Sequence, residues 1–311
     1  MTEPTPTSTT PATPAAPADA PVVPERPVRA PRPTPVGTAA VVSTAGVMVS
    51  LVALWLVAQL LVLSDLAHDR AQAILFRDFR VQLAETTAPL GPVVPTGDPV
   101  AILRIPAIDL EEVVVEGTSS GELLAGPGHQ RDTVLPGQEG QSYVLGRAAT
   151  YGAPFADLGD LEVGEPVEVT TSQGVAVLTV TGVRRDGDPR PAPLAAGSTR
   201  LTLVSAEGEG RFSSLTPERT VYVDAESADA FPAPPRAGGA IEESERAMAT
   251  DPTALPLLAL YLALLTALVL AVVAARQRWE ALLVWTMAGP LAMALAWLTT
   301  DTVMRLLPNL V

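Results

Sequence analysis

Three long apolar runs without charged residues dominate the sequence and limit what the chain can fold into. They cover residues 38–63, 254–275 and 281–300. Each is close to, or longer than, the about 20 residues that an α-helix needs to cross the core of a bilayer. We therefore predict three transmembrane helices. A cleaved signal peptide is the alternative for the first run, but signal cores span only about 7–15 residues.

Arginines beside these runs predict how the chain is oriented in the membrane. Arg26, Arg29 and Arg32 precede the first run, and Arg276 and Arg278 lie in the short loop between the second and third runs. Positively charged residues are retained on the cytoplasmic side. Both groups of arginines therefore place the N-terminus inside the cell and the segment between the first and second runs outside it.

The remaining segments differ in composition, and each predicts a different role. Residues 1–37 are rich in proline, threonine and alanine, which predicts a disordered cytoplasmic tail. Residues 64–97 are expected to form an extracellular helical stalk, and residues 227–253 an external linker. Residues 98–226 then form the folded extracellular domain.

Short β-like runs, separated by glycine and proline, fill this domain. They cover residues 100–105, 112–115, 142–145, 166–171, 175–183, 200–206 and 219–225. Several alternate apolar and polar residues, which is typical of half-buried strands. Their number and spacing predict an all-β barrel or sandwich.

The composition excludes several classes of function. The chain has no cysteine, so disulfides, thiolate metal sites and cysteine nucleophiles are ruled out. Its net charge of −14 argues against a nucleic-acid partner. The two histidines, His68 and His129, are too few for a histidine metal site, and we predict no metal and no cofactor. None of the three apolar runs contains an acidic residue, a histidine or an arginine, which argues against an ion transporter.

Residues 100–224 resemble the sortase family. The resembling segments follow the family's order, and they are Ile102-Leu103-Arg104-Ile105-Pro106, Val115-Glu116-Gly117-Thr118, Gly126-Pro127-Gly128-His129, Leu135-Pro136-Gly137, the run from Thr150 to Leu158, Leu201-Thr202-Leu203, and Arg219. The resemblance implies an all-β, sortase-like closed β-barrel of about eight strands on a bacterial membrane anchor. It also implies a transpeptidase of cell-surface proteins that uses a histidine, a cysteine and an arginine.

This sequence departs from the family at two of those three catalytic positions. Arg147 stands where the family has histidine, and Ala206 stands where it has cysteine, so only Arg219 matches. An alanine methyl group cannot form a thioester, and an arginine stays protonated and cannot act as a base. Ser205 is a candidate replacement nucleophile, but it points away from Ala206 on a strand, so we expect it to be buried. We therefore predict no cysteine transpeptidase activity.

Four residues are candidates for a binding groove. They are His129, Arg147, Tyr151 and Arg219. We expect His129 to brace a loop and Tyr151 to pack at the groove rim. Arg147 and Arg219 are expected to flank the groove, where guanidinium groups bind anions well.

Two kinds of function remain open. The first is an inactive binding or assembly module at the cell surface, whose partner is the membrane together with a surface-protein peptide segment or another membrane protein. The alternative is a divergent sortase-family transpeptidase or hydrolase that acts on cell-surface proteins by a non-cysteine mechanism.

Overall fold

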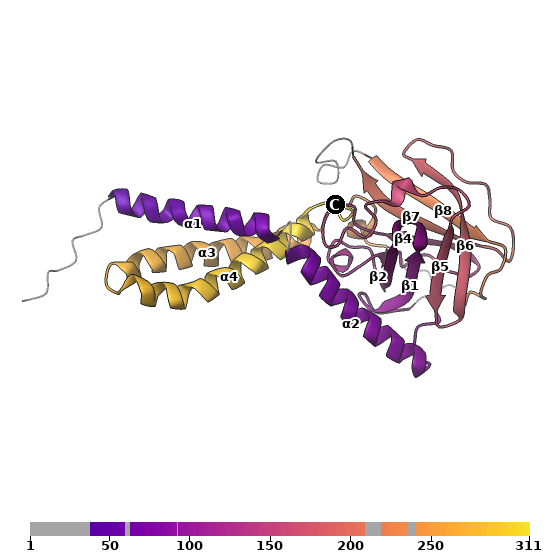
Figure 1. Cartoon of the computed structure of the whole chain (residues 1–311), viewed down its shortest axis with the longest axis horizontal. Coiled ribbons are helices and arrows are strands. Elements are labelled where there is room, and N and C mark those ends of the chain that lie inside the picture. The colour runs from indigo at the N-terminus through magenta and orange to yellow at the C-terminus, as the bar shows by residue number, and fades with distance from the viewer. Residues whose placement is uncertain (1–37, 60–62, 92, 209–218, 236–240) are drawn as a thin grey trace, which may run out of the picture. The chain divides into compact units, whose positions relative to one another are not determined.

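Eight β-strands close into a barrel (Figure 1). They are β1 (Pro99–Ile105), β2 (Leu110–Glu116), β3 (Gly128–His129), β4 (Gly140–Leu145), β5 (Pro166–Thr171), β6 (Gly174–Arg185), β7 (Thr199–Glu207) and β8 (Arg219–Ser227). Around the barrel they follow the order β1-β2-β3-β4-β7-β8-β6-β5. The predicted closed barrel is confirmed, and each of the predicted β-like runs lies in a strand. β3 was missed because a strand this short shows no periodicity.

The structure is a computed structural model, and it describes all residues except 1–37, 60–62, 92, 209–218 and 236–240. The predicted tail, residues 1–37, therefore lies outside the described residues. Part of the first predicted membrane span, residues 38–63, lies outside them as well.

Strand β7 is buried on both of its faces, which makes it the centre of the domain. Successive side chains on a strand point to opposite faces. Leu201 and Leu203 accordingly lie in the main barrel core, whereas Val204 and Ala206 belong to a second apolar cluster.

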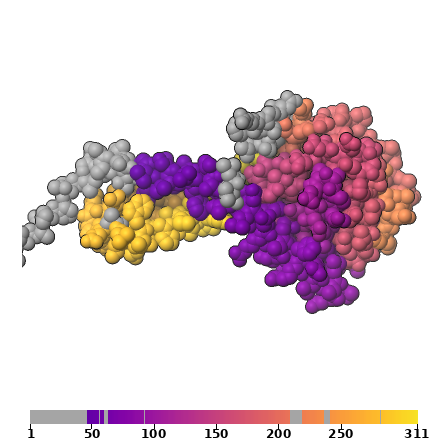
Figure 2. Space-filling view, in the orientation of Figure 1, coloured from indigo at the N-terminus to yellow at the C-terminus, as the bar shows by residue number. Residues whose placement is uncertain are grey.

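Helix α2 (Ser64–Ala84), which lies in the predicted stalk, packs along β1 and β2 (Figures 1 and 2). Gln72 fixes this contact, because its side-chain amide donates to the main-chain oxygens of Val113 at 3.2 Å and Ala125 at 2.7 Å. Its side-chain oxygen also accepts from the Val113 N–H at 2.7 Å. The helix is therefore docked on the barrel along its length rather than standing clear of it.

Three apolar helices complete the structure: α1 (Thr38–Ala58), α3 (Leu255–Arg276) and α4 (Ala281–Leu306). Within the described residues, two helices are long and apolar enough to cross a membrane, Pro252–Arg276 and Leu282–Leu306. In the first predicted span only the shorter apolar stretch Gly46–Trp55 is found, since residues 60–62 are not described. The prediction of three spans is thus corrected to two candidate spans.

The three apolar helices pack against one another. The rings of Trp55 in α1 and Trp297 in α4 lie 6.3 Å apart. Met48 of α1 shares a buried cluster with Val272 of α3 and Val284 of α4. Helix α4 continues through Pro290 and past the predicted end of the span at residue 300.

Candidate functional site

Arg147 and Ala206, the two residues that the resemblance singled out, lie close together where β4 meets β7. These strands run parallel, with Leu145 opposite Val204. The pairing continues beyond β4, because the Gly146 N–H donates to the Val204 carbonyl oxygen at 3.0 Å. Arg147 and Ala206 each follow this pair within two residues. The register thus brings together the positions that the resemblance singled out.

Ala206 faces an apolar cluster that another part of the chain fills. We call the residues Leu123, Leu145, Ala148, Val204 and Ala206 the Ala206 cluster. Leu310 packs into it and is fully buried, and Ala206 is only 5% exposed. The Ala148 N–H also donates to the Leu310 carbonyl oxygen at 2.9 Å. Where an open groove was expected, the chain's own residues close the surface.

Arg147 is completely buried and binds the same segment. One of its terminal nitrogens donates to the carbonyl oxygen of Ser120 at 3.0 Å and to its hydroxyl at 2.8 Å. The other donates to the Thr150 hydroxyl at 3.1 Å and to the main-chain oxygen of Val311. Thr150 in turn donates to that same Val311 oxygen at 2.7 Å. The guanidinium therefore holds two loops and Val311 together.

The electrostatics of Arg147 follow from this burial. Desolvation lowers its pKa to about 10, so it remains a cation at neutral pH. The ring of Tyr151 lies 5.7 Å from its guanidinium carbon and supplies a cation–π contact. A buried cation of this kind requires acceptors, and main-chain oxygens supply several of them.

Asn309 anchors the segment on its other side. Its side-chain amide donates to the main-chain oxygens of Thr118 at 2.8 Å and Arg246 at 2.9 Å. Its own N–H donates to the Ala249 carbonyl oxygen at 2.9 Å. Residues 309–311 are thus bound both by the barrel and by residues 242–251, the segment that leads into α3.

The segment 242–251 is itself tied to the barrel. Arg131 forms a two-pronged ion pair with Glu245, at 2.7 and 2.6 Å. The Thr118 hydroxyl donates to the Glu245 carbonyl oxygen at 2.6 Å. Both flanks of the α3–α4 hairpin are therefore attached to the same edge of the barrel.

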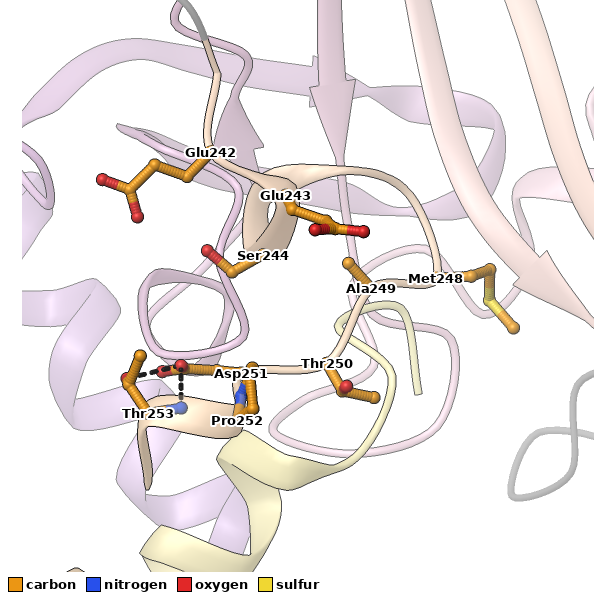
Figure 3. A pocket seen from close by; sticks show the side chains of 9 residues that line it. All are labelled: Glu242, Glu243, Ser244, Met248, Ala249, Thr250, Asp251, Pro252 and Thr253. Carbon is orange, nitrogen blue, oxygen red and sulfur yellow. Dashed lines mark hydrogen bonds between the residues drawn. The ribbon is translucent and has the colours of Figure 1, made fainter. Parts of the chain in front are cut away.

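A pocket of about 600 Å³ opens beside this segment (Figure 3). Its lining residues are Glu242, Glu243, Ser244, Met248, Ala249, Thr250, Asp251, Pro252 and Thr253. Glu242 and Glu243 point in different directions in Figure 3, so their carboxylates do not converge on one point. Asp251 is used locally, since it accepts hydrogen bonds from the N–H and hydroxyl of Thr253. The chain's C-terminal stretch runs beside Ala249 and Thr250. The pocket therefore lies next to the contact between Asn309 and Ala249.

His129 lies in a separate buried contact. Its Nδ1 is 2.8 Å from a Glu116 carboxylate oxygen, and its Nε2 is 2.8 Å from the Val134 carbonyl oxygen. The side chains of His129 and Glu116 are each 1% exposed. Both ring nitrogens are therefore engaged within the protein, in the geometry of a residue that braces a loop.

The two remaining groove candidates, Tyr151 and Arg219, do not line an open groove beside Ala206. Tyr151 is buried rather than at a rim, and burial raises the pKa of its hydroxyl. Arg219 lies opposite Glu207 on the neighbouring strand, whereas Thr220 lies opposite Ala206. Arg219 helps to lower the pKa of Glu207, although the hydrogen bond from Arg185 to that carboxylate is the larger cause. The strand register therefore does not place Arg219 directly beside Ala206.

Ser205 is fully buried and faces away from the Ala206 cluster. Its hydroxyl lies 3.2 Å from the Gly146 carbonyl oxygen and 3.1 Å from the Phe155 carbonyl oxygen. Main-chain carbonyl oxygens are too weakly basic to remove the proton of a hydroxyl, so these two contacts do not activate Ser205. Among the described residues, no group of three or more His, Cys, Asp or Glu is arranged to hold a metal ion.

Comparison with known proteins supports the assignment of the barrel. Residues 103–225 match the Sortase domain family. A stretch of 79 residues, 25% of this chain, is 37% identical to Sortase D of Bacillus subtilis (strain 168) and spans 38% of that relative's length.

Solved sortase structures are also similar to this chain. A Clostridium perfringens Sortase D5 transpeptidase is 17% identical with a TM-score of 0.40, covering 51% of this chain and 96% of the other. Sortase E from Streptomyces avermitilis is 25% identical with a TM-score of 0.33, covering 42% and 89%.

Proposed function

We propose that this chain is a membrane-anchored, extracytoplasmic, sortase-like module that lacks cysteine transpeptidase chemistry and serves in assembly at the bacterial cell surface. Its partner in this proposal is another membrane protein. The observation that supports the proposal most strongly is what occupies and covers the position where the sortase family has its cysteine. Ala206 occupies that position, and Leu310 of the same chain packs into the cluster that contains it.

The chemistry of the site supports inactivity. No sulfur nucleophile is encoded anywhere in the chain. Arg147 is held as a cation against neutral acceptors, so it cannot take a proton from a nucleophile. Ser205, the nearest hydroxyl in sequence, is bonded to main-chain oxygens on the other face of β7. The alternative of a divergent enzyme gains no support from these contacts.

The proposed membrane arrangement is a hairpin of the two candidate spans, with the loop between α3 and α4 in the cytoplasm. It rests on Arg276 and Arg278 in that loop. One contact agrees with it: the Asp251 N–H, just before α3, donates to the Arg305 carbonyl oxygen near the end of α4 at 3.2 Å. The barrel-proximal ends of both helices therefore lie together, as a hairpin entered from outside requires.

Incubation of the full chain in detergent micelles with sorting-motif peptides and an amine acceptor is expected to give neither an acyl adduct nor a transfer product. The physical reason is the missing nucleophile, whose loss in a model triad costs about a million-fold in turnover. Intact-mass spectrometry detects the adduct and chromatography detects the product. A sortase that cleaves the same peptide serves as the positive control. Any covalent peptide adduct on this chain would refute the inactive assignment.

Photocrosslinking in native membranes is expected to capture a partner through the helices rather than through the barrel. Helices α3 and α4 enclose an apolar hollow of about 230 Å³, and Met287 on its wall is 67% exposed. A photoreactive residue at position 287 should yield a discrete crosslinked band. The matched control is position 163, since Val163 on the barrel is 70% exposed. A band from position 163 alone would favour a binding module over an assembly module.

A further inference from the structure

We infer that the Ala206 cluster and Arg147 form an internal receptor for residues 309–311 of this chain, which keeps the family's active-site position closed to outside peptides. This inference rests on the proposed function, because it concerns the same position on the same barrel. It adds the identity of the occupant: a segment of this chain that begins three residues beyond the end of α4.

The burial profile marks where the docked segment begins. Arg305, Leu306, Leu307 and Pro308 are only partly buried. From Asn309 onward burial is nearly complete, with exposures of 0% for Asn309, 0% for Leu310 and 2% for Val311. The chain thus changes at Asn309 from a surface segment to one enclosed by the barrel.

The receptor recognises both side chains and main chain. Leu310 supplies the apolar contact with the Ala206 cluster, and the Ala148 N–H fixes its carbonyl oxygen. The Asn309 side-chain amide donates hydrogen bonds to two main-chain oxygens, those of Thr118 and Arg246. Asn309 and Val311 are held by hydrogen bonds, and Leu310 between them is held by apolar contacts. A shift of the segment by one residue would break these hydrogen bonds and move Leu310 out of the cluster, so the contacts define one register.

The hydrogen bond from Arg147 to Val311 stabilises the docked state of residues 309–311. Among the described residues, its buried guanidinium has no bond to a carboxylate side chain, and the Val311 oxygen is one of its four acceptors. A buried cation that loses an acceptor pays a large desolvation penalty. Departure of residues 309–311 would therefore leave Arg147 underbonded as well as uncovering Ala206.

The substitution at position 206 is compatible with this occupant. Val204 and Ala206 lie on the face of β7 that Leu310 covers. A small methyl group there accommodates the leucine side chain. The site that resembles a catalytic position has thus become part of an apolar contact within the chain.

Thiol labelling tests the inference directly, because the chain has no cysteine of its own. The variant Ala206→Cys is prepared in the full chain and in the chain lacking residues 309–311, both in detergent micelles. N-ethylmaleimide should label the introduced thiol at least about tenfold more slowly in the full chain, since labelling then requires local opening. Val163→Cys, at a position that is 70% exposed, should label equally fast in both backgrounds.

Equal labelling rates for Ala206→Cys in the two chains would overturn the inference. If the shortened chain fails to fold, a second measurement decides. The pair Ala148→Cys and Leu310→Cys in the full chain should be joined by a disulfide under a small oxidant, because the main chains of these residues are hydrogen-bonded at 2.9 Å. The pair Val163→Cys and Leu310→Cys is the control. Failure of the first pair to join sinks the internal receptor but leaves the inactive assignment standing, whereas acyl transfer would sink that assignment alone.

Discussion

Replacing Arg147 with alanine is expected to lower the free energy of unfolding of the barrel by about 3–5 kcal/mol. Arg147 is fully buried and donates to Ser120, Thr150 and Val311. Alanine would leave these acceptors unsatisfied and create a cavity, and the loss should also release residues 309–311. Pulse proteolysis of the full chain in urea, with detergent held constant, measures the change.

The matched control is Arg104→Ala on strand β1. Arg104 is 53% exposed and pairs with Glu168 at 3.0 Å. An exposed pair of this kind contributes at most about 1 kcal/mol. If Arg147→Ala destabilised the barrel no more than Arg104→Ala, the central role assigned to the buried guanidinium would be wrong.

The destabilisation by Arg147→Ala should not depend on pH in the neutral range. Burial lowers the folded-state pKa of Arg147 from its ordinary value to about 10. The pKa of Arg147 is lower in the folded state than in the unfolded state. The stability of the protein therefore changes with pH only above the folded-state pKa, where the folded state has lost the proton and the unfolded state still holds it. At about pH 6 and about pH 8 the arginine is protonated in both the folded and the unfolded states, so the loss should be equal at the two values.

The sequence predicted the barrel well because its signals are local. Alternation along runs such as 166–171 and 175–183 reports which residues face the core, and each run proved to lie in a strand. The resemblance to sortases pointed to Arg147 and Ala206 as residues of one site. The register of β4 and β7 places them together. Local pattern and family order therefore sufficed for the scaffold.

The contents of the site could not be predicted from the sequence. Leu310 is one apolar residue among many near the end of an apolar helix, and nothing in its neighbours indicates that it fills a cluster far away along the chain. The acceptors of Arg147 are mostly main-chain oxygens or hydroxyls, which carry no charge pattern in sequence. We expected Arg147 and Arg219 to flank one groove, but Arg147 contacts Val311 and Arg219 lies opposite Glu207. Such contacts depend on tertiary structure alone.

Replacing His129 with alanine is the second change with a large expected effect, again about 3–5 kcal/mol of unfolding free energy. His129 is the side-chain partner of the Glu116 carboxylate at 2.8 Å, and both side chains are almost fully buried. Without the imidazole, a buried carboxylate would lack compensation, and the Val134 carbonyl oxygen would lose its donor. Pulse proteolysis of the full chain again provides the measurement.

A double-mutant cycle separates the carboxylate penalty from the loss of packing. In Glu116→Gln the side chain keeps its shape but carries no charge, so adding it to His129→Ala should recover part of the stability. Both positions lie at the pairing of β2 with β3, where Glu116 stands opposite His129, so the two changes act on one contact. If Glu116→Gln and His129→Ala were simply additive, the two side chains would not form an energetically coupled pair, and His129 would stabilise the loop through its contacts with Val134 and Thr133 instead.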